Sequence, residues 1–264
     1  MTGDAPAGGP KPKIDTTVPH SARVWNYWLG GKDNYPVDRE MGDQILAMVP
    51  DMPRLARADR AFLGRAVQYL AGEAGIRQFL DIGTGLPTAN NTHEVAQAIA
   101  PDSRIVYVDN DPLVLVHAQA LLTSSSEGAC DYVDADVREP EKILAEAART
   151  LDFSKPIAVM MLGILGQIPD SDHPETIVAK LRDAVPSGSY LTVSDGVNTS
   201  ETFNEAARHT GWYHVRSPEQ IAGFLAGLEL AEPGVVPLGR WRPLATRFPE
   251  QDDVPGMCGV GRKP

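Results

Sequence analysis

The sequence predicts an α/β protein with a doubly wound, mostly parallel sheet of seven strands, an antiparallel last strand and an N-terminal helical cap. From residue 77 onward, short apolar segments alternate with amphipathic segments of about 10 residues, a pattern typical of βαβ units. Residues 156–165 are almost wholly apolar, as expected of a strand buried on both faces. Gly83 and Gly85 follow the first strand, where the chain must turn sharply.

The chain divides into three parts. Residues 1–19 are rich in glycine and proline and can bury little apolar surface, so we expect a flexible tail. Residues 20–75 form the predicted helical cap, whose first helix can start at a serine cap, Ser21, and end at Gly30. Two further cap helices show apolar residues spaced by three or four. Residues 76–264 form the predicted α/β domain.

Seven apolar segments predict the strands of this domain: residues 77–82, 104–109, 130–133, 156–165, 189–194, 228–236 and 256–261. Helices are expected between them at residues 92–100, 112–122, 140–150, 172–185, 202–209 and 217–225. No helical pattern separates the last two strands, so we expect these two to pair antiparallel.

The composition argues against several classes of partner and site. The net charge of −11 over 264 residues argues against a nucleic-acid partner, because binding phosphates needs a dense basic face. The two cysteines lie far apart and the six histidines show no metal-ligand spacing, so we expect neither a disulfide framework nor a metal site. No apolar run approaches the roughly 20 residues that cross a bilayer, and no signal peptide is evident. We therefore expect a cytoplasmic protein without a membrane partner.

The loop after the first strand predicts a ligand site. Its glycines let the backbone approach a ligand closely, and ligands of doubly wound folds bind at this edge of the sheet. A dinucleotide motif would place a third glycine at Thr88, and here the next helix is set back, so a pyrophosphate would lose its partner. Asp81 at the start of the loop would also be unfavourable near phosphates. A nucleoside ligand without phosphates suits the loop better.

Two more acids follow neighbouring strands. Asp109 ends the second strand and can accept both ribose hydroxyls of a nucleoside; alternatively, Asp109 and Asp111 are an acid pair at a helix N-terminus. Asp136 follows the third strand and can accept from an exocyclic amine such as adenine N6, although a solvated acidic loop is the simpler alternative. The three strand ends together favour a nucleoside site.

These residues resemble the class I S-adenosylmethionine (SAM)-dependent methyltransferases, whose sheet is Rossmann-like. Asp81 to Gly85 is similar to their first motif, Asp109 to their ribose-binding acid and Asp136 to their adenine-side acid. The alternating strands and helices and the final antiparallel pair also resemble their seven-stranded sheet.

A narrower resemblance covers the chain from about Pro19. Trp25 to Tyr35, the Asp81 to Pro87 loop and Val260 to Pro264 look like a bacterial methyltransferase-like family of largely unassigned substrate. This resemblance implies that the loop between Gly31 and Tyr35 covers the pocket. It names no catalytic residue, so the catalytic residues stay unassigned.

The resemblance implies the cofactor S-adenosyl-L-methionine and a small-molecule methyl acceptor, with oligomeric state left open. The candidate cofactor contacts are Asp81, Gly83, Thr84, Gly85, Asp109, Asn110, Asp136, Val137, Leu162, Gly31 and Tyr35. Methyl transfer from an activated donor depends largely on positioning and desolvation, so no general base is strictly required.

Two departures keep alternatives open. The third glycine of the first motif would fall at Pro87, and the segment after the fourth strand lacks the Asp/Asn-Pro-Pro-Tyr motif of amino-directed enzymes. The missing motif leaves a non-catalytic SAM-binding protein as an alternative. The acid and glycines alone would also permit an NAD(P)-dependent oxidoreductase, which the set-back helix disfavours.

Overall fold

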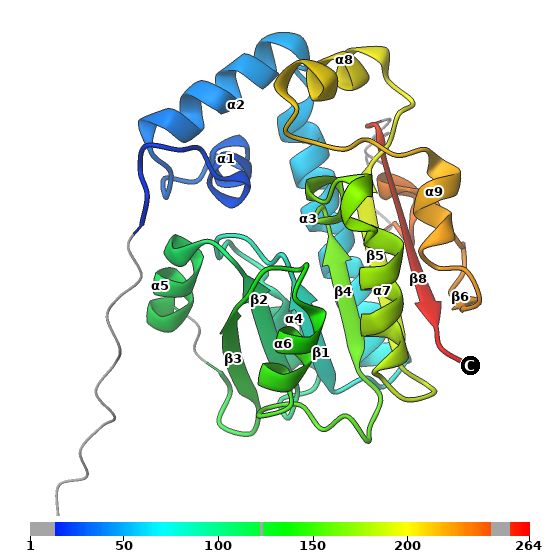
Figure 1. The fold of residues 1–264 in the computed structure, drawn as a ribbon. Coiled ribbons are helices and arrows are strands. Elements are labelled where there is room, and N and C mark those ends of the chain that lie inside the picture. Colours follow the sequence, from blue (N-terminus) through cyan, green and yellow to red (C-terminus); the bar gives the residue numbers. More distant parts are fainter. Residues whose placement is uncertain (1–13, 122–123, 244–253) are drawn as a thin grey trace, which may run out of the picture.

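One twisted sheet runs through the protein in a computed structural model that describes residues 14–121, 124–243 and 254–264 (Figure 1). The strand order is β3-β2-β1-β4-β5-β8-β6, and β7 also pairs with β8. The strands are β1 (Gln78–Ile82), β2 (Arg104–Asp109), β3 (Ala129–Asp134), β4 (Ala158–Leu162), β5 (Tyr190–Gly196), β6 (Glu229–Leu230), β7 (Val236–Pro237) and β8 (Gly256–Arg262). The α/β architecture predicted from the sequence is confirmed.

The five strands β1 to β5 run parallel, so their carboxyl ends meet at one edge of the sheet. β8 runs antiparallel to β5, β6 and β7. The sheet therefore has eight strands rather than seven, because the predicted strand 228–236 is divided into β6 and β7. A turn between them, in which Gly234 adopts φ +88° and its N–H donates to the Ala231 carbonyl, explains the division.

Helices cover both faces of the sheet (Figure 1). On one face lie α6 (Pro140–Ala147), α7 (Pro174–Asp183) and α9 (Pro218–Gly223), whose apolar residues share a core with Leu80 and Ile82 of β1. On the other face lie α3 (Met52–Gln68) and α4 (Thr92–Ile99), which share a core with Phe79. Successive β1 residues point to opposite faces, which explains why this strand is apolar throughout.

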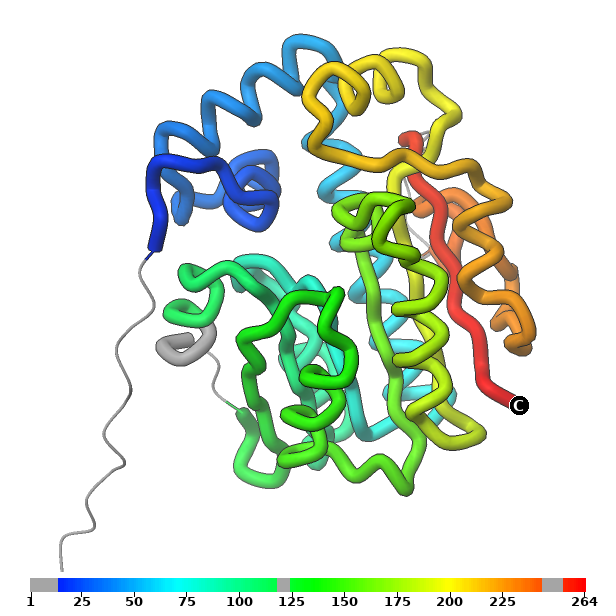
Figure 2. The backbone as a smooth tube through the Cα atoms, in the orientation of Figure 1, coloured from blue at the N-terminus to red at the C-terminus, as the bar shows by residue number. Residues whose placement is uncertain are grey.

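The remaining helices lie near the carboxyl edge of the sheet. They are α1 (Ser21–Trp28), α2 (Pro36–Met48), α5 (Pro112–Leu121) and α8 (Glu201–Thr210). Figure 2 shows α2 and α8 side by side above this edge, although they are far apart in the sequence. Short π- and 3₁₀-turns complete the chain: η1 (Tyr69–Glu73), η2 (Leu165–Gln167), η3 (Asp170–Asp172) and η4 (Leu238–Arg240).

The N-terminal segment is attached to the rest of the protein. α3 shares one core with the sheet, as the edge-to-face contact of Phe62 with Trp241 illustrates, with 5.4 Å between ring centroids. Residues 1–13 of the predicted tail lie outside the described residues. Residues 14–19 form neither helix nor strand, yet Ile14 packs beside Leu86 and the Asp15 carbonyl accepts from Arg23. These contacts tie the segment before α1 to the ligand loop.

One helix start differs from its prediction. The helix expected from Asp172 begins at Pro174 instead, and Asp172 lies in the preceding 3₁₀-turn. His173 precedes the helix with φ +52°, and the fixed φ of proline suits the first helical position. The helix expected at residues 217–225 is α9, which opens with a capping box formed by Ser217 and Gln220.

Candidate functional site

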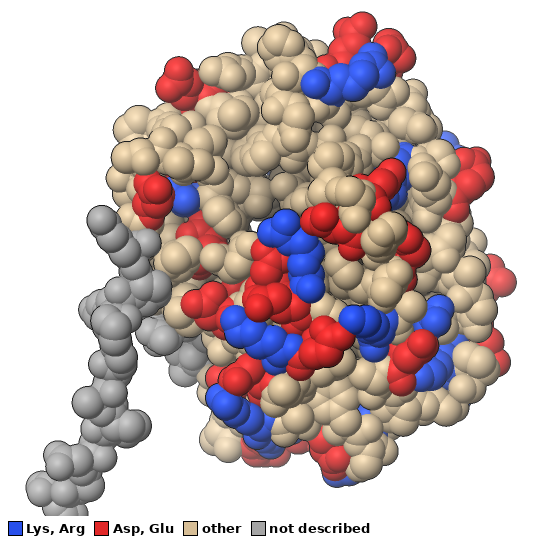
Figure 3. Space-filling model, viewed as in Figure 1, with Lys and Arg blue, Asp and Glu red and all other residues tan. Residues whose placement is uncertain are grey.

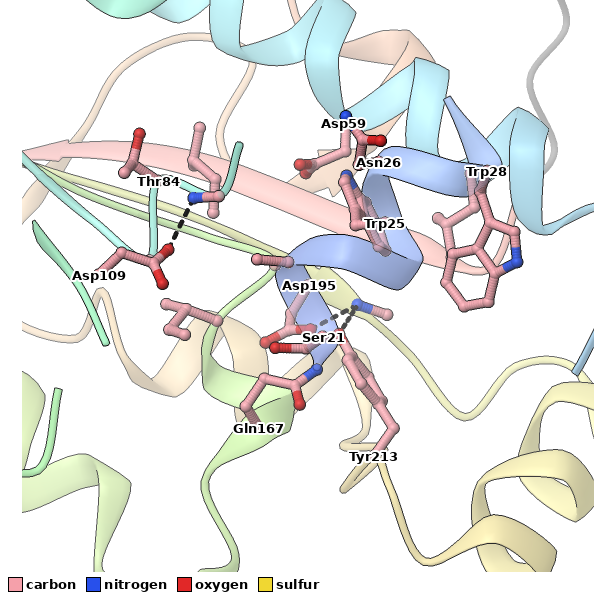
Figure 4. A pocket seen from close by; sticks show the side chains of 18 of the residues that line it. Ser21, Trp25, Asn26, Trp28, Asp59, Thr84, Asp109, Gln167, Asp195 and Tyr213 are labelled. Carbon is pink, nitrogen blue, oxygen red and sulfur yellow. Dashed lines mark hydrogen bonds between the residues drawn. The ribbon is translucent and has the colours of Figure 1, made fainter. Parts of the chain in front are cut away.

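A long pocket opens along the carboxyl edge of the parallel strands, and Figure 4 shows part of its lining. One end lies over β1, β2 and β3. The other end extends between α1, α3 and α8. The lining of the first end includes Asp81, Gly83, Thr84, Gly85, Leu86, Val108, Asp109, Asn110, Ala135, Val137 and Leu162. Eight of the eleven predicted cofactor contacts are thus brought together.

The glycine loop is tied to the neighbouring strand. Gly83 and Gly85 adopt φ +73° and +66°, a backbone region that favours glycine. The N–H groups of Gly83 and Thr84 donate to the Val108 carbonyl at 2.8 and 3.3 Å. A Cβ at Gly83 would lie 2.7 Å from the Ile164 side chain, so the loop also packs closely against the segment after β4. The two glycines marked in the sequence are therefore required by the local geometry.

Asp109 joins the ends of the first two strands. Its carboxylate accepts from the Gly85 N–H at 2.8 Å and from the Asp111 N–H at 2.9 Å, and its exposed fraction is 8%. Burial raises the pKa of Asp109, and the two backbone N–H groups oppose that shift. Within the described chain, no lysine or arginine forms a salt bridge with Asp109. Its remaining acceptor capacity faces the pocket.

Asp81 lies buried beneath the loop. The Thr92 hydroxyl at the start of α4 donates to its carboxylate at 2.6 Å. Burial raises the pKa of Asp81 to about 6, and the Thr92 hydrogen bond and the Arg60 charge act in the opposite direction. α4 begins at a capping box formed by Asn91 and Glu94, which fixes where Thr92 lies. The set-back helix thus presents a side chain to Asp81.

Asp136 lies outside the lining of the pocket. Its carboxylate accepts from the Arg138 guanidinium at 2.6 and 2.8 Å and from the Asn110 side-chain amide at 3.0 Å. These hydrogen bonds, those of Arg138 first, lower the pKa of Asp136 to about 2. Its neighbours Ala135 and Val137 do line the pocket. A direct adenine contact of Asp136 stays a prediction, and its observed contact with the pocket runs through Asn110.

Gly31 and Tyr35 also lie outside the lining. A Cβ at Gly31 would lie 2.3 Å from the Asn26 side chain, and Asn26 does line the pocket. The Asn26 side-chain oxygen, Oδ1, accepts from the Asp33 N–H at 3.1 Å and from the Asn34 side-chain amide at 2.9 Å. This loop therefore supports the pocket through Asn26 rather than by direct contact.

A buried ion-pair network holds α1 over the pocket. The Arg23 guanidinium lies 3.0 Å from Asp111 after β2 and 3.7 Å from Asp38 of α2, and His20 lies 3.2 Å from Asp111. Arg23, Asp38 and Asp111 are almost fully buried. Asp111, one of the acid pair noted in the sequence, thus anchors α1.

Sequence reasoning missed the second end of the pocket. This end combines aromatic and aliphatic side chains with two buried acids: Trp25, Trp28, Ile45, Met52, Leu55, Asp59, Leu63, Asp195, Phe203, Ala206, Ala207, Thr210, Trp212, Tyr213 and Leu238. Trp25 and Trp28 are three residues apart and share one helix face, a spacing that is equally typical of core packing. Asp195 directly follows a predicted strand, as Asp109 ends one, and this position was the available signal.

The residues at the first end fit S-adenosylmethionine. Two buried carboxylates, Asp81 and Asp109, suit an ammonium and a pair of ribose hydroxyls. Ala135, Val137 and Leu86 supply apolar walls for a base. Among the described residues, no group of three or more histidines, cysteines and acids could hold a metal ion. No helix in that part of the chain is both long and apolar enough to cross a membrane.

The surface shows mixed charge on the face seen in Figure 3, where acidic and basic side chains are interspersed. Ion pairs on α6 and α7 include Lys180 with Glu141 and Lys142 with Glu139. A continuous basic surface is not visible on this face.

The sequence and the fold are similar to those of known proteins. Residues 7–264 match the family described as S-adenosyl methyltransferase. A DUF574 family protein from Streptomyces avermitilis is 44% identical, with a TM-score of 0.91 over 96% of this chain and 100% of that one. A candidate methyltransferase from Thermobifida fusca is 43% identical, with a TM-score of 0.86 over 94% of this chain and 96% of that one.

More distant structures show the fold alone. The plantazolicin methyltransferase BpumL, solved with a triazolic desmethylPZN analogue and SAH, is 10% identical with a TM-score of 0.53. It is aligned over 92% of this chain and 96% of its own. A comparison with curated proteins finds no match.

Proposed function

The chain belongs to the S-adenosyl methyltransferase family, and we propose that it methylates a small molecule held at the aromatic end of the pocket. Its cofactor is S-adenosylmethionine. One observation carries the proposal for the acceptor: a single pocket runs from Asp81 and Asp109 to the aromatic side chains of α1 and α8. A cofactor at one end and an acceptor at the other would therefore meet without crossing solvent.

We assign the cofactor contacts from the donor set at the first end. Asp109 accepts the ribose hydroxyls while its other lone pairs stay bonded to the loop N–H groups. Asp81, held by Thr92, pairs with the ammonium of the methionine portion. Gly83, Thr84 and Gly85 pass beside that portion. Asn110, Val137 and Leu162 lie beside the nucleoside, and Asp136 acts by holding the Asn110 amide.

The acceptor end supports a small molecule rather than a polymer. α1, α2, α3 and α8 surround it, and the buried Arg23 network fixes α1 in place. Bound S-adenosylmethionine supplies a methyl group on a positively charged sulfur. The chain's contribution is to orient the acceptor and to exclude water, which Trp25, Phe203 and Leu63 can do as apolar walls. A cytoplasmic location and the absence of nucleic-acid partners stay predictions.

Calorimetry tests the cofactor assignment. S-adenosylmethionine and S-adenosylhomocysteine should both bind the purified protein, and NAD should not compete with them. Tighter binding of NAD, or no binding of either SAM ligand at millimolar concentration, would overturn the proposal. An acceptor screen with labelled methyl groups then separates an active enzyme from a non-catalytic SAM-binding protein, which would bind the cofactor without forming a methylated product.

A further inference from the structure

A carboxylate lies among aromatic rings at the acceptor end of the pocket. Asp195 at the end of β5 lines the pocket together with Trp25, Phe203 and Tyr213 (Figure 4). Its exposed fraction is 3%. Its two oxygens accept from the backbone N–H groups of Gly166 at 2.7 Å and Gly196 at 2.9 Å. In the described part of the chain, no cationic side chain forms a salt bridge with Asp195.

Two glycines allow the rings to approach this acid. A Cβ at Gly166 would lie 2.1 Å from the Tyr213 ring, and one at Gly196 would lie 2.7 Å from the Phe203 ring. The Phe203 and Tyr213 ring centroids are 5.8 Å apart. Because Gly166 and Gly196 are also the residues that donate to Asp195, the same backbone holds both the rings and the carboxylate.

One further acid and one cation lie near Asp195. Asp59 of α3 is the neighbouring acid, and the Ser194 hydroxyl donates to it. Arg216 is the nearby cation, but its guanidinium donates at 2.7 Å to the carbonyls of Leu165 and Ile168 and at 2.8 Å to Asp170. Its hydrogen bonds are thus directed to the segment after β4 rather than to Asp195.

We infer that the methyl acceptor is a hydrophobic amine whose nitrogen lies at Asp195 between the aromatic rings. This inference rests on the proposed function. An ammonium carries a charge that both the carboxylate and the faces of tyrosine and tryptophan rings attract. An uncharged alcohol can donate a single hydrogen bond to the carboxylate but has no cationic attraction to the rings. An acidic acceptor would be repelled by the ionised form of Asp195. The aliphatic side chains of Met52, Leu55 and Leu63 would contact the hydrophobic body of the amine.

Asp195 can also take up the proton that the acceptor must lose. The lone pair of an ammonium becomes available only when an N–H bond breaks and its proton bonds to an acceptor oxygen, leaving a neutral amine and a neutral carboxyl. Burial raises the pKa of Asp195 to about 7, while the Gly196 and Gly166 N–H groups and Arg216 limit the shift. A carboxylate with that pKa exchanges a proton readily near neutral pH.

Calorimetry with two matched probes tests the inference. 2-Phenylethylamine and 2-phenylethanol are titrated into the protein saturated with S-adenosylhomocysteine, so that no transfer can occur. We expect the amine to bind at least about tenfold more tightly than the alcohol. Asp195→Asn should reduce the amine affinity by about tenfold and the alcohol affinity by less than about twofold. Circular dichroism and retained S-adenosylhomocysteine binding establish that the variant is folded.

Glu205→Gln is the matched control. Glu205 is an exposed acid on α8, the helix that carries Phe203, and this substitution removes the same charge. It should leave both probe affinities unchanged. Equal binding of the two probes to the unsubstituted protein, or no binding of either, would overturn the amine inference, and neither result depends on a variant folding. Failure of S-adenosylhomocysteine itself to bind would instead overturn the proposed function.

Discussion

Arg23 and Asp111 form an ion pair inside the protein, with 3.0 Å between the Arg23 Nε and Asp111 Oδ2 atoms. Arg23 belongs to α1 and Asp111 to the loop after β2, so the pair joins the helix that covers the pocket to the strand that carries Asp109. Removing one member of a buried pair leaves the other charge without compensation. The ion pair therefore links the position of α1 to the strand end that carries Asp109.

Arg23→Met should destabilise the protein by about 3–5 kcal/mol, because Asp38 and Asp111 would remain buried without their cation. Urea unfolding measures the change. Arg208→Met provides the control, since Arg208 pairs with Glu201 on the surface, where the side chains are 65% and 72% exposed. That substitution should cost less than about 1 kcal/mol. Equal losses in the two variants would mean that the Arg23 network does not stabilise the fold.

Asp109→Ala should weaken the binding of S-adenosylhomocysteine by about 1.5–3 kcal/mol through loss of charge-assisted hydrogen bonds. It should also lower the free energy of unfolding by about 1–3 kcal/mol, because the N–H groups of Gly85 and Asp111 lose their acceptor. Calorimetry and urea unfolding separate the two effects. Asp134→Ala is a close control: Asp134 pairs with Asp109 in the β2–β3 register but is exposed. An unchanged affinity in Asp109→Ala would refute the ribose assignment.

The affinity for S-adenosylhomocysteine should fall as the pH is lowered through about 6. The pKa of Asp81 is raised to about 6 by burial, and an ammonium pairs only with the ionised carboxylate. Affinity is therefore full above this pKa and is lost below it, by about tenfold between pH 8 and pH 5. Asp195 and Asp109 also have raised pKa values, so the comparison is with Asp81→Asn. Parallel pH curves for the two proteins would show that Asp81 does not meet the ammonium.

Gly31→Ala should weaken ligand binding although Gly31 does not line the pocket. The added methyl would displace the Asn26 side chain, whose Oδ1 atom accepts from the Asp33 N–H and the Asn34 side-chain amide. Gly64→Ala is the control, because a Cβ there meets nothing within 4 Å and alanine favours the helix by about 0.5–1 kcal/mol. Ligand titration and thermal unfolding of both variants check this. A Gly31→Ala protein that binds normally would show that Asn26 tolerates displacement.

The first end of the pocket could be predicted because its residues follow one another along the sequence in a recognisable order. Asp81, Gly83, Gly85 and Asp109 all lie at strand ends, and parallel strands bring these ends together. The α/β fold could be predicted because short apolar strand segments alternate with amphipathic helix segments along the sequence. Both predictions depend on the order and spacing of neighbouring residues, which can be read from the sequence itself.

The acceptor end could not be predicted in the same way. Trp25, Asp59, Asp195 and Tyr213 come from four distant segments, and only the packing of α1, α3 and the loop before α9 brings them to one pocket. The surroundings of Asp136 could not be predicted either. Its position in the sequence predicts a ligand contact, which stays a prediction, and the structure adds that Arg138, two residues later, donates to its carboxylate. A side-chain pairing of this kind depends on loop geometry that no periodicity encodes.

β8 is the last strand in the sequence, yet it pairs with β5 on one side and with β6 and β7 on the other. During synthesis, β5 keeps an unpaired edge until this strand has formed, and β6 and β7 lack the partner that holds them. Asp195 lies on β5 opposite Met257 of β8. The strand that carries Asp195 therefore gains its second neighbour in the sheet only after residues 256–262 have been synthesised.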